Sequence, residues 1–105
     1  MDSEAIYQII QKTVRSFLPD ARILLFGSRA RGTADEHSDY DLLVITQNPL
    51  TRTEKLSWSS QVHKAIVKAI HAPIDLLLYS EEDVAKNKEL PGHIVRTALR
   101  EGVVL

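Results

Sequence analysis

Residues 24–45 read LLFGSRARGTADEHSDYDLLVI, and this stretch decides how the chain folds. Apolar side chains stand at both ends, and a polar segment with a Gly-Ser step and an Asp-x-Asp pair lies between them. Short apolar runs bounded by turn residues indicate buried strands, so we predict one strand over 22–26 and another over 40–46. A polar loop over 33–38 leads into the second strand.

Two carboxylates stand at the start of the second predicted strand. Asp39 and Asp41 are two residues apart, and side chains at positions i and i+2 of a strand point to the same face. Two negative charges so close raise each other's pKa and favour a cation between them. Oxygen ligands at this spacing suit Mg²⁺, which binds one or two carboxylates together with substrate phosphates. The alternative is a solvated junction of loop and strand, since aspartates are common in turns.

The Gly-Ser step upstream of the acids is typical of an anion-binding turn. Backbone N–H groups that follow a strand and open a helix lack partners, and Gly27 has no side chain to keep a phosphate away from them. Ser28 can cap a short helix over 29–32. Arg29 and Arg31 either clamp phosphates or lie on a solvated helix face. The segment is no P-loop, because a threonine stands where that motif needs its lysine, and it lacks the G-x-G-x-x-G of a dinucleotide site.

A third acid, Asp75, lies in the apolar run IDLLLY, which predicts a strand over 74–79. A lone carboxylate among apolar neighbours is costly to bury unless it is paired or binds a metal, although an aspartate at a strand edge can also reach solvent. Strands lie about 4.8 Å apart, so acids on two adjacent strands can share one metal cluster. Three acids beside an anion-binding turn describe a two-metal phosphoryl-transfer site.

The remaining segments alternate between helical and strand patterns. Helices are predicted over 3–18, from Thr51 or Thr53 to about 70, over 81–86, and from Pro91 to Gly102, with a closing strand at 103–105. The apolar stripe Ile94, Val95, Ala98 and Leu99 on the last helix is expected to be core. This order predicts an α/β (α+β) fold in which a small mixed sheet packs against helices.

Composition limits the classes of function. The sequence has 105 residues, a net charge of -1 and no cysteine, which predicts one domain over 1–105 without disulfides or thiolate zinc sites. The near-neutral charge argues against a generally basic nucleic-acid binder but leaves room for a local basic patch, and we expect no direct binding of nucleic acid. No apolar run approaches the length of a membrane helix, and the acidic start MDSEAIYQII does not resemble a signal peptide, so we expect a cytoplasmic protein.

Histidine and tryptophan add little to the site. His63 and His71 lack a third ligand nearby in sequence, which argues against zinc. His37 precedes Asp39 and either contacts a nucleotide or lies in solvent. Trp58, on the long predicted helix, is expected to pack in the core, with contact to a partner as the alternative.

The order GSRARG, SDYDLLV and IDLLL resembles the nucleotidyltransferase superfamily that includes DNA polymerase β, and the length resembles its minimal nucleotidyltransferase (MNT) group. The resemblance implies a polymerase β palm-like fold and covers residues from about 22 to 105. It implies that Gly27 and Ser28 hold a nucleoside triphosphate, to which we also assign Arg31. It further implies that Asp39, Asp41 and Asp75 bind two Mg²⁺ ions and catalyse the transfer.

The implied reaction is attack by an acceptor hydroxyl on the α-phosphorus of a nucleoside triphosphate, with ATP as the expected donor. Larger family members carry domains that bind the acceptor, so we expect a partner chain to supply it here. Similar minimal members act as antitoxins of a HEPN toxin, and some attach AMP to it. The alternatives are a non-catalytic module that neutralises a HEPN partner by contact and, ranked lower, an antibiotic adenylyltransferase. The nucleotide, the acceptor and the oligomeric state stay open.

Overall fold

The computed structural model describes residues 2–105. Along the chain the elements are α1 (Ser3–Phe17), β1 (Arg22–Phe26), α2 (Gly27–Arg31), β2 (Tyr40–Thr46), α3 (Arg52–Ile70), β3 (Ile74–Ser80), α4 (Glu81–Asn87), α5 (Ile94–Glu101) and β4 (Val103–Val104). The strands form one four-stranded sheet in the order β3-β2-β1-β4. β1 runs antiparallel to β2 and to β4, whereas β2 and β3 are parallel and are joined by α3 as the crossover that parallel strands require. The predicted mixed α/β fold is confirmed.

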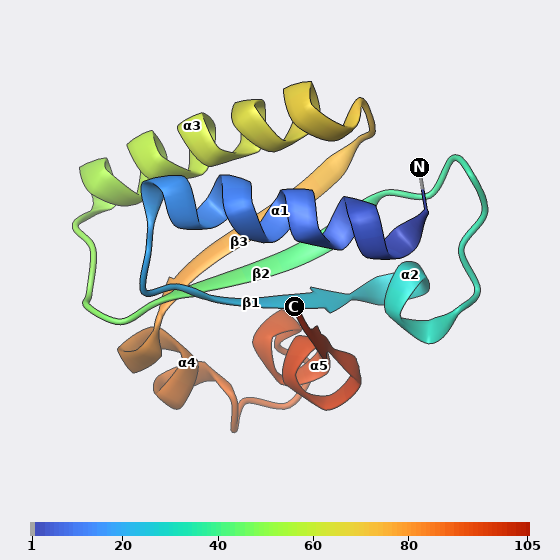
Figure 1. The fold of residues 1–105 in the computed structure, drawn as a ribbon. Helices are drawn as coiled ribbons and strands as arrows, with labels where there is room; N and C mark the ends of the chain where they lie inside the picture. Colours follow the sequence, from blue (N-terminus) through green and yellow to red (C-terminus); the bar gives the residue numbers. More distant parts are fainter. Residues whose placement is uncertain (1) are drawn as a thin grey trace.

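Helices cover both faces of the sheet, as Figure 1 shows: α1 and α3 lie on one face, and α4 and α5 on the other. Side chains of the central strands alternate between the two layers. Ile23, Leu42 and Val44 pack with α1 and α3, whereas Leu24 and Leu43 pack with α4 and α5. Burial on both faces explains why these strands read as continuous apolar runs.

Asp41 and Asp75 belong to the face that α4 and α5 cover. The alternation along β2 places Tyr40 and Leu42 in the core under α1 and α3, which sends Asp41 to the opposite face with Leu43. In β3, Asp75 likewise falls on the same face as Leu77, which packs against the core under α4 and α5. Both acids therefore approach α5 rather than the long helices.

Two predicted helix starts are wrong. α2 begins at Gly27 with Phe26 as its N-cap residue, so Ser28 lies inside the helix and does not cap it. α5 begins at Ile94 and not at Pro91, because His93 Nδ1 accepts the N–H of Val95 at 3.1 Å and caps the helix. Both α3 and α4 begin with a capping box, formed by Thr51 with Glu54 and by Ser80 with Asp83.

Trp58 connects the two long helices. Its ring lies 6.2 Å from that of Phe17 in an edge-to-face contact, and the side chain packs half-buried against the core under α1 and α3. Core packing, the expected role of Trp58, is confirmed. Within residues 2–105, no helix combines the length and the apolar composition that crossing a bilayer requires.

Candidate active site

The parallel register of β2 and β3 brings two of the predicted acids side by side. Asp41 is the direct neighbour of Asp75 across these strands, and of Phe26 on β1. Asp39 lies just before β2 and is exposed, close enough for its charge to act on Asp41. The strand pairing, rather than closeness in sequence, thus places acids 34 positions apart next to each other.

Burial and neighbouring charge disfavour the ionised form of Asp41. Partial burial is the largest cause that raises its pKa, followed by the negative charges of Asp75 and Asp39. Arg31 acts in the opposite direction but does not cancel the rise. A divalent cation between these carboxylates would relieve the repulsion.

The donor set fits a metal that binds together with a nucleotide. Across residues 2–105, no three His, Cys, Asp or Glu side chains lie close enough to hold a metal ion by themselves. Asp41 and Asp75, however, are adjacent, and Mg²⁺ commonly takes one or two carboxylates and completes its shell with substrate phosphates and water. The side chains present therefore suit Mg²⁺ as part of a nucleotide complex.

Gly27, the first residue of α2, lies directly against Asp41. Its backbone has φ +73°, a conformation that glycine adopts readily, and a Cβ at this position would collide with Asp41 Oδ2. Glycine is thus needed both for the turn into α2 and for the close approach to Asp41.

A carboxylate from α5 already occupies the predicted anion site. Glu101 Oε1 accepts the N–H of Gly27 at 2.9 Å, and the two carboxylate oxygens accept Arg31 Nη1 at 3.1 and 3.2 Å. The hydrogen bond from Gly27 is the largest cause that lowers the pKa of Glu101, and Arg31 adds to it. Gly27 N–H and Arg31 thus already bind an anion that belongs to the protein, the carboxylate of Glu101.

The two arginines of α2 point in different directions. Arg31 pairs with Glu101 and its charge acts on Asp41, and its side chain is 51% exposed. Arg29 instead places its guanidinium carbon 4.0 Å from the centre of the Tyr40 ring and donates to Ser38 O from Nε and Nη2, at 3.3 and 2.9 Å. Of the two, only Arg31 lines the pocket at the acids.

The pocket has a volume of about 390 Å³, within the range of small-ligand sites. Its walls come from β1, α2, β2, β3 and α5, and its lining comprises Phe26, Gly27, Ser28, Arg31, Asp41, Asp75, Leu77, Ile94, Thr97 and Glu101. Five of the six predicted site residues line it together, whereas Asp39 is not among the lining residues.

The pocket residues on α5 were not predicted from the sequence. Ile94 was expected in the core, but it is 40% exposed and lines the pocket with Thr97 and Glu101, while Val95 and Ala98 are buried as expected. The spacing of Ile94, Thr97 and Glu101, three or four residues apart, marks one helix face. That signal could have shown that the three side chains act together, but not which strand end they face.

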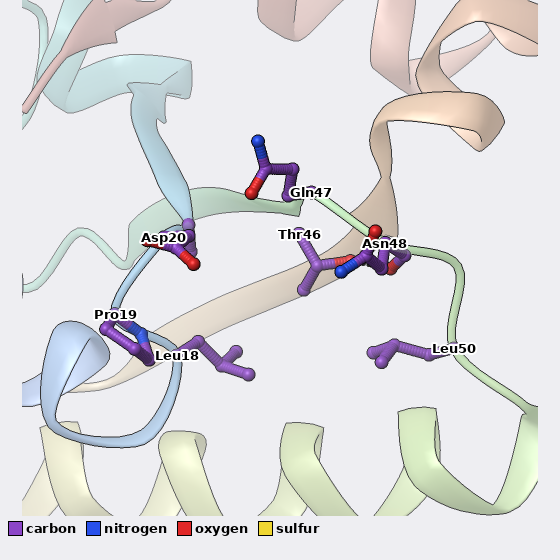
Figure 2. A pocket seen from close by; sticks show the side chains of 8 residues that line it. Leu18, Pro19, Asp20, Thr46, Gln47, Asn48 and Leu50 are labelled. Carbon is purple, nitrogen blue, oxygen red and sulfur yellow. Dashed lines mark hydrogen bonds between the residues drawn. The ribbon is translucent and has the colours of Figure 1, made fainter.

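A second, smaller cavity of about 160 Å³ lies at the opposite end of β1 and β2. Figure 2 shows it between the turn that follows α1 and the turn that follows β2. One polar side chain of its lining already has a hydrogen-bond partner in the protein, because Thr46 Oγ1 donates to Asn48 O at 2.9 Å. None of the predicted site residues lies there.

A comparison with protein families assigns nearly the whole chain to one domain family. The model of the nucleotidyltransferase domain matches residues 7–105. The chain belongs to the nucleotidyltransferase domain family. The predicted family is confirmed by this match over nearly the whole chain.

Relatives within this family include candidate protein adenylyltransferases. MJ1305 of Methanocaldococcus jannaschii, named as such a candidate, is 55% identical over 42 residues, which are 39% of this chain and 29% of the relative. The chain spans less than two-thirds of the length of the curated relatives it matches.

Solved structures share the fold at low sequence identity. A toxin–antitoxin with AMP-PNP is 20% identical, with a TM-score of 0.63, over 98% of this nucleotidyltransferase chain and 72% of its own. A tri-AMPylated HEPN toxin of Shewanella oneidensis in complex with an MNT antitoxin gives 16% identity and a TM-score of 0.58, over 96% of this chain and 69% of its own.

Proposed function

We propose that this chain, acting as a single minimal domain over 1–105, transfers AMP from ATP to a hydroxyl of a HEPN-type toxin and thereby neutralises the toxin. One observation carries the proposal: a single pocket joins the acid pair Asp41 and Asp75 to the anion donors Gly27 N–H and Arg31. Membership of the nucleotidyltransferase family supports the reaction class. Structural likeness to toxin–antitoxin complexes, one with AMP-PNP and one with a tri-AMPylated HEPN toxin, supports the donor and the partner.

The proposed transfer exchanges one oxygen–phosphorus bond for another. The acceptor oxygen bonds to the α-phosphorus, the bond from that phosphorus to the oxygen bridging the β-phosphorus breaks, and pyrophosphate leaves. Asp75, exposed at the pocket, takes the proton of the acceptor hydroxyl. Gly27, Ser28 and Arg31 hold the triphosphate tail and its leaving pyrophosphate.

Asp39, Asp41 and Asp75 would hold two Mg²⁺ ions in this proposal. Bound there, the ions lower the pKa of the acceptor hydroxyl and neutralise charge on the triphosphate. The negative charges of Asp75 and Asp39, which act on Asp41, support a cation at this point, because the carboxylates repel one another without it.

Transfer of label from ATP carrying ³²P at the α-phosphate tests the function. The purified chain is incubated with Mg²⁺ and with or without a HEPN partner, and label on the partner is measured. Asp41→Asn and Asp75→Asn should each reduce the label by at least about a hundredfold, because each removes a metal ligand or the base. Asp20→Asn, an exposed aspartate at the far end of β1, is the matched control and should transfer normally. Unchanged labelling by Asp41→Asn and Asp75→Asn would refute the catalytic role.

A protection assay separates catalysis from simple contact. Cells that express the toxin are rescued with the wild type or with an Asp39→Asn/Asp41→Asn double variant. Loss of rescue by the double variant is expected if transfer neutralises the toxin. Equal rescue by both proteins would show that contact alone is sufficient, which is the alternative function.

A further inference from the structure

Arg29 contacts the residues on both sides of Asp39, the backbone of Ser38 and the ring of Tyr40. Its Nε and Nη2 donate to the carbonyl oxygen of Ser38, the residue before Asp39. Its guanidinium lies over the ring of Tyr40, the residue after Asp39, at 4.0 Å from the ring centre. Tyr40 itself is fixed, since its side chain is buried and its N–H donates to Pro73 O at 3.1 Å.

The exposed Asp39 needs such support more than the other two acids. Asp41 and Asp75 lie within paired strands, whereas Asp39 stands at the end of a polar loop outside the sheet. Apart from the bonds of Arg29 and the bond of Tyr40 to Pro73, the hydrogen bonds before and after Asp39 are local and join Asp35 to His37 and Ser38. Arg29 therefore connects this end of the loop to α2.

We propose that Arg29 is a positioning residue that fixes Asp39 beside Asp41 for metal binding, an inference that rests on the proposed function. Arginine suits the task because its planar group donates two hydrogen bonds to one carbonyl while it stacks on an aromatic ring. α2 then contributes two residues to the site: Arg31 lines the pocket, and Arg29 holds the neighbours of Asp39.

Binding of Mn²⁺ in the presence of AMP-PNP, measured by electron paramagnetic resonance, tests the role of Arg29. Arg29→Gln should weaken Mn²⁺ binding about tenfold, the usual loss when a group that orients a metal ligand is removed. Arg29→Lys should lose less, because an ammonium can still donate to Ser38 O. At limiting Mg²⁺ the variants should transfer slowly, and excess Mg²⁺ should restore the rate, which general damage to the fold would not allow.

Arg22→Gln is the matched control. Arg22 also makes bidentate hydrogen bonds, to Glu81 at 2.7 and 2.8 Å, but it lies at the other end of β1. The Arg22→Gln change should therefore leave Mn²⁺ binding as it is. Equal Mn²⁺ affinity in the wild type and both Arg29 variants would overturn the role of Arg29 alone. No Mn²⁺ binding by the wild type would overturn the proposed function as well. Should Arg29→Gln fail to fold, Arg29→Lys decides.

A separate observation concerns Glu101. Its carboxylate occupies the donors assigned to the triphosphate, Gly27 N–H and Arg31. Glu101 is the last residue of α5 and lines the pocket with 22% of its side chain exposed, so it can leave towards solvent. We infer that Glu101 is an internal anion that a bound triphosphate must displace, which also rests on the proposed function.

Calorimetric titration with inorganic triphosphate and Mg²⁺ tests this displacement. Glu101→Gln keeps the shape of the side chain but removes its charge, so triphosphate should bind about tenfold more tightly, the worth of one charge-assisted hydrogen bond. Glu81→Gln is the control, since it removes a carboxylate paired with an arginine away from the pocket.

Equal or weaker binding by Glu101→Gln would overturn the inference about Glu101, while binding by the wild type would leave the nucleotide site standing. Binding by neither protein would overturn both. Glu101→Asp provides a second variant if Glu101→Gln does not fold: its shorter side chain cannot reach both donors, so triphosphate should again bind more tightly.

Discussion

At the scale of single residues, the site depends on a contact that only glycine permits. Gly27 and Asp41 approach so closely that any Cβ on Gly27 would overlap the carboxylate. The N–H of Gly27 also donates to an anion, the carboxylate of Glu101. One residue therefore forms the turn into α2, allows the approach of Asp41 and supplies a hydrogen-bond donor to the pocket. The pKa of Asp41 is raised at this point, first by burial and then by the negative charges of Asp75 and Asp39.

Gly27→Ala should therefore be far more damaging than the same change at Gly32. Both glycines have positive φ, which disfavours alanine by about 1–2 kcal/mol. A Cβ on Gly32 meets open space, so Gly32→Ala should lose only that amount and keep triphosphate binding. Gly27→Ala should lose more stability in urea unfolding and should abolish binding. Equal effects of the two changes would contradict the packing of Gly27 on Asp41.

Asp41→Asn should stabilise the protein at neutral pH. Because the pKa of Asp41 is raised in the folded state, the folded protein binds its proton more readily than the unfolded chain. Stability from this group is fully present at low pH and is lost as pH rises through the folded pKa. The variant should thus exceed the wild type in the free energy of unfolding at pH 7, and the difference should shrink below the ordinary aspartate pKa of about 3.9. Asp20→Asn controls for the loss of one negative charge, and a gain that does not vary with pH would contradict the explanation.

At the scale of elements, the sequence predicted best where the signal is local. Strands over 40–46 and 74–79 agree with β2 and β3 to within one residue, because each apolar run ends at polar residues, and Ser80 at the end of β3 caps α4. The start of α5 could not be predicted in this way, because histidine is not a usual capping residue and Pro91 has the usual profile of a helix start. For α2, the strand leads directly into the helix at Gly27, so no side-chain cap marks the boundary.

The start of α3 offers a test of local prediction, since Thr51 and Thr53 were both candidates. Thr51 Oγ1 accepts the N–H of Glu54 at 3.1 Å, and Glu54 Oε1 accepts the N–H of Thr51 at 2.9 Å. Thr51→Ala should lower the free energy of unfolding by about 1 kcal/mol. Thr53→Ala, in the exposed first turn, should change it by less than about 0.5 kcal/mol. Urea unfolding measures both, and the opposite ranking would place the cap at Thr53.

At the scale of the whole molecule, two core layers position one site. The acids follow from strands whose pairing could be anticipated, but Glu101 reaches Gly27 across 74 positions of sequence only because α5 docks on the sheet. That docking depends on Val95 and Ala98 packing against Leu24 and Leu43, a three-dimensional fit without a sequence motif. The five lining residues with the proposed chemical roles were therefore predictable, and the three that α5 contributes were not.

Two buried valines, one under each face of the sheet, separate the stability of the fold from the stability of the site. Val95 on α5 and Val62 on α3 are both at most 1% exposed, so each change to alanine should lower the free energy of unfolding by about 2 kcal/mol. Only Val95→Ala loosens the helix whose Glu101 holds the Gly27 N–H. Hydrogen exchange of the Gly27 amide should then accelerate more in Val95→Ala than in Val62→Ala at matched global stability, because local opening of α5 exposes it without unfolding the sheet. Equal acceleration would mean that α5 opens only when the whole molecule unfolds. The free energy of opening this wall of the pocket would then equal the free energy of global unfolding.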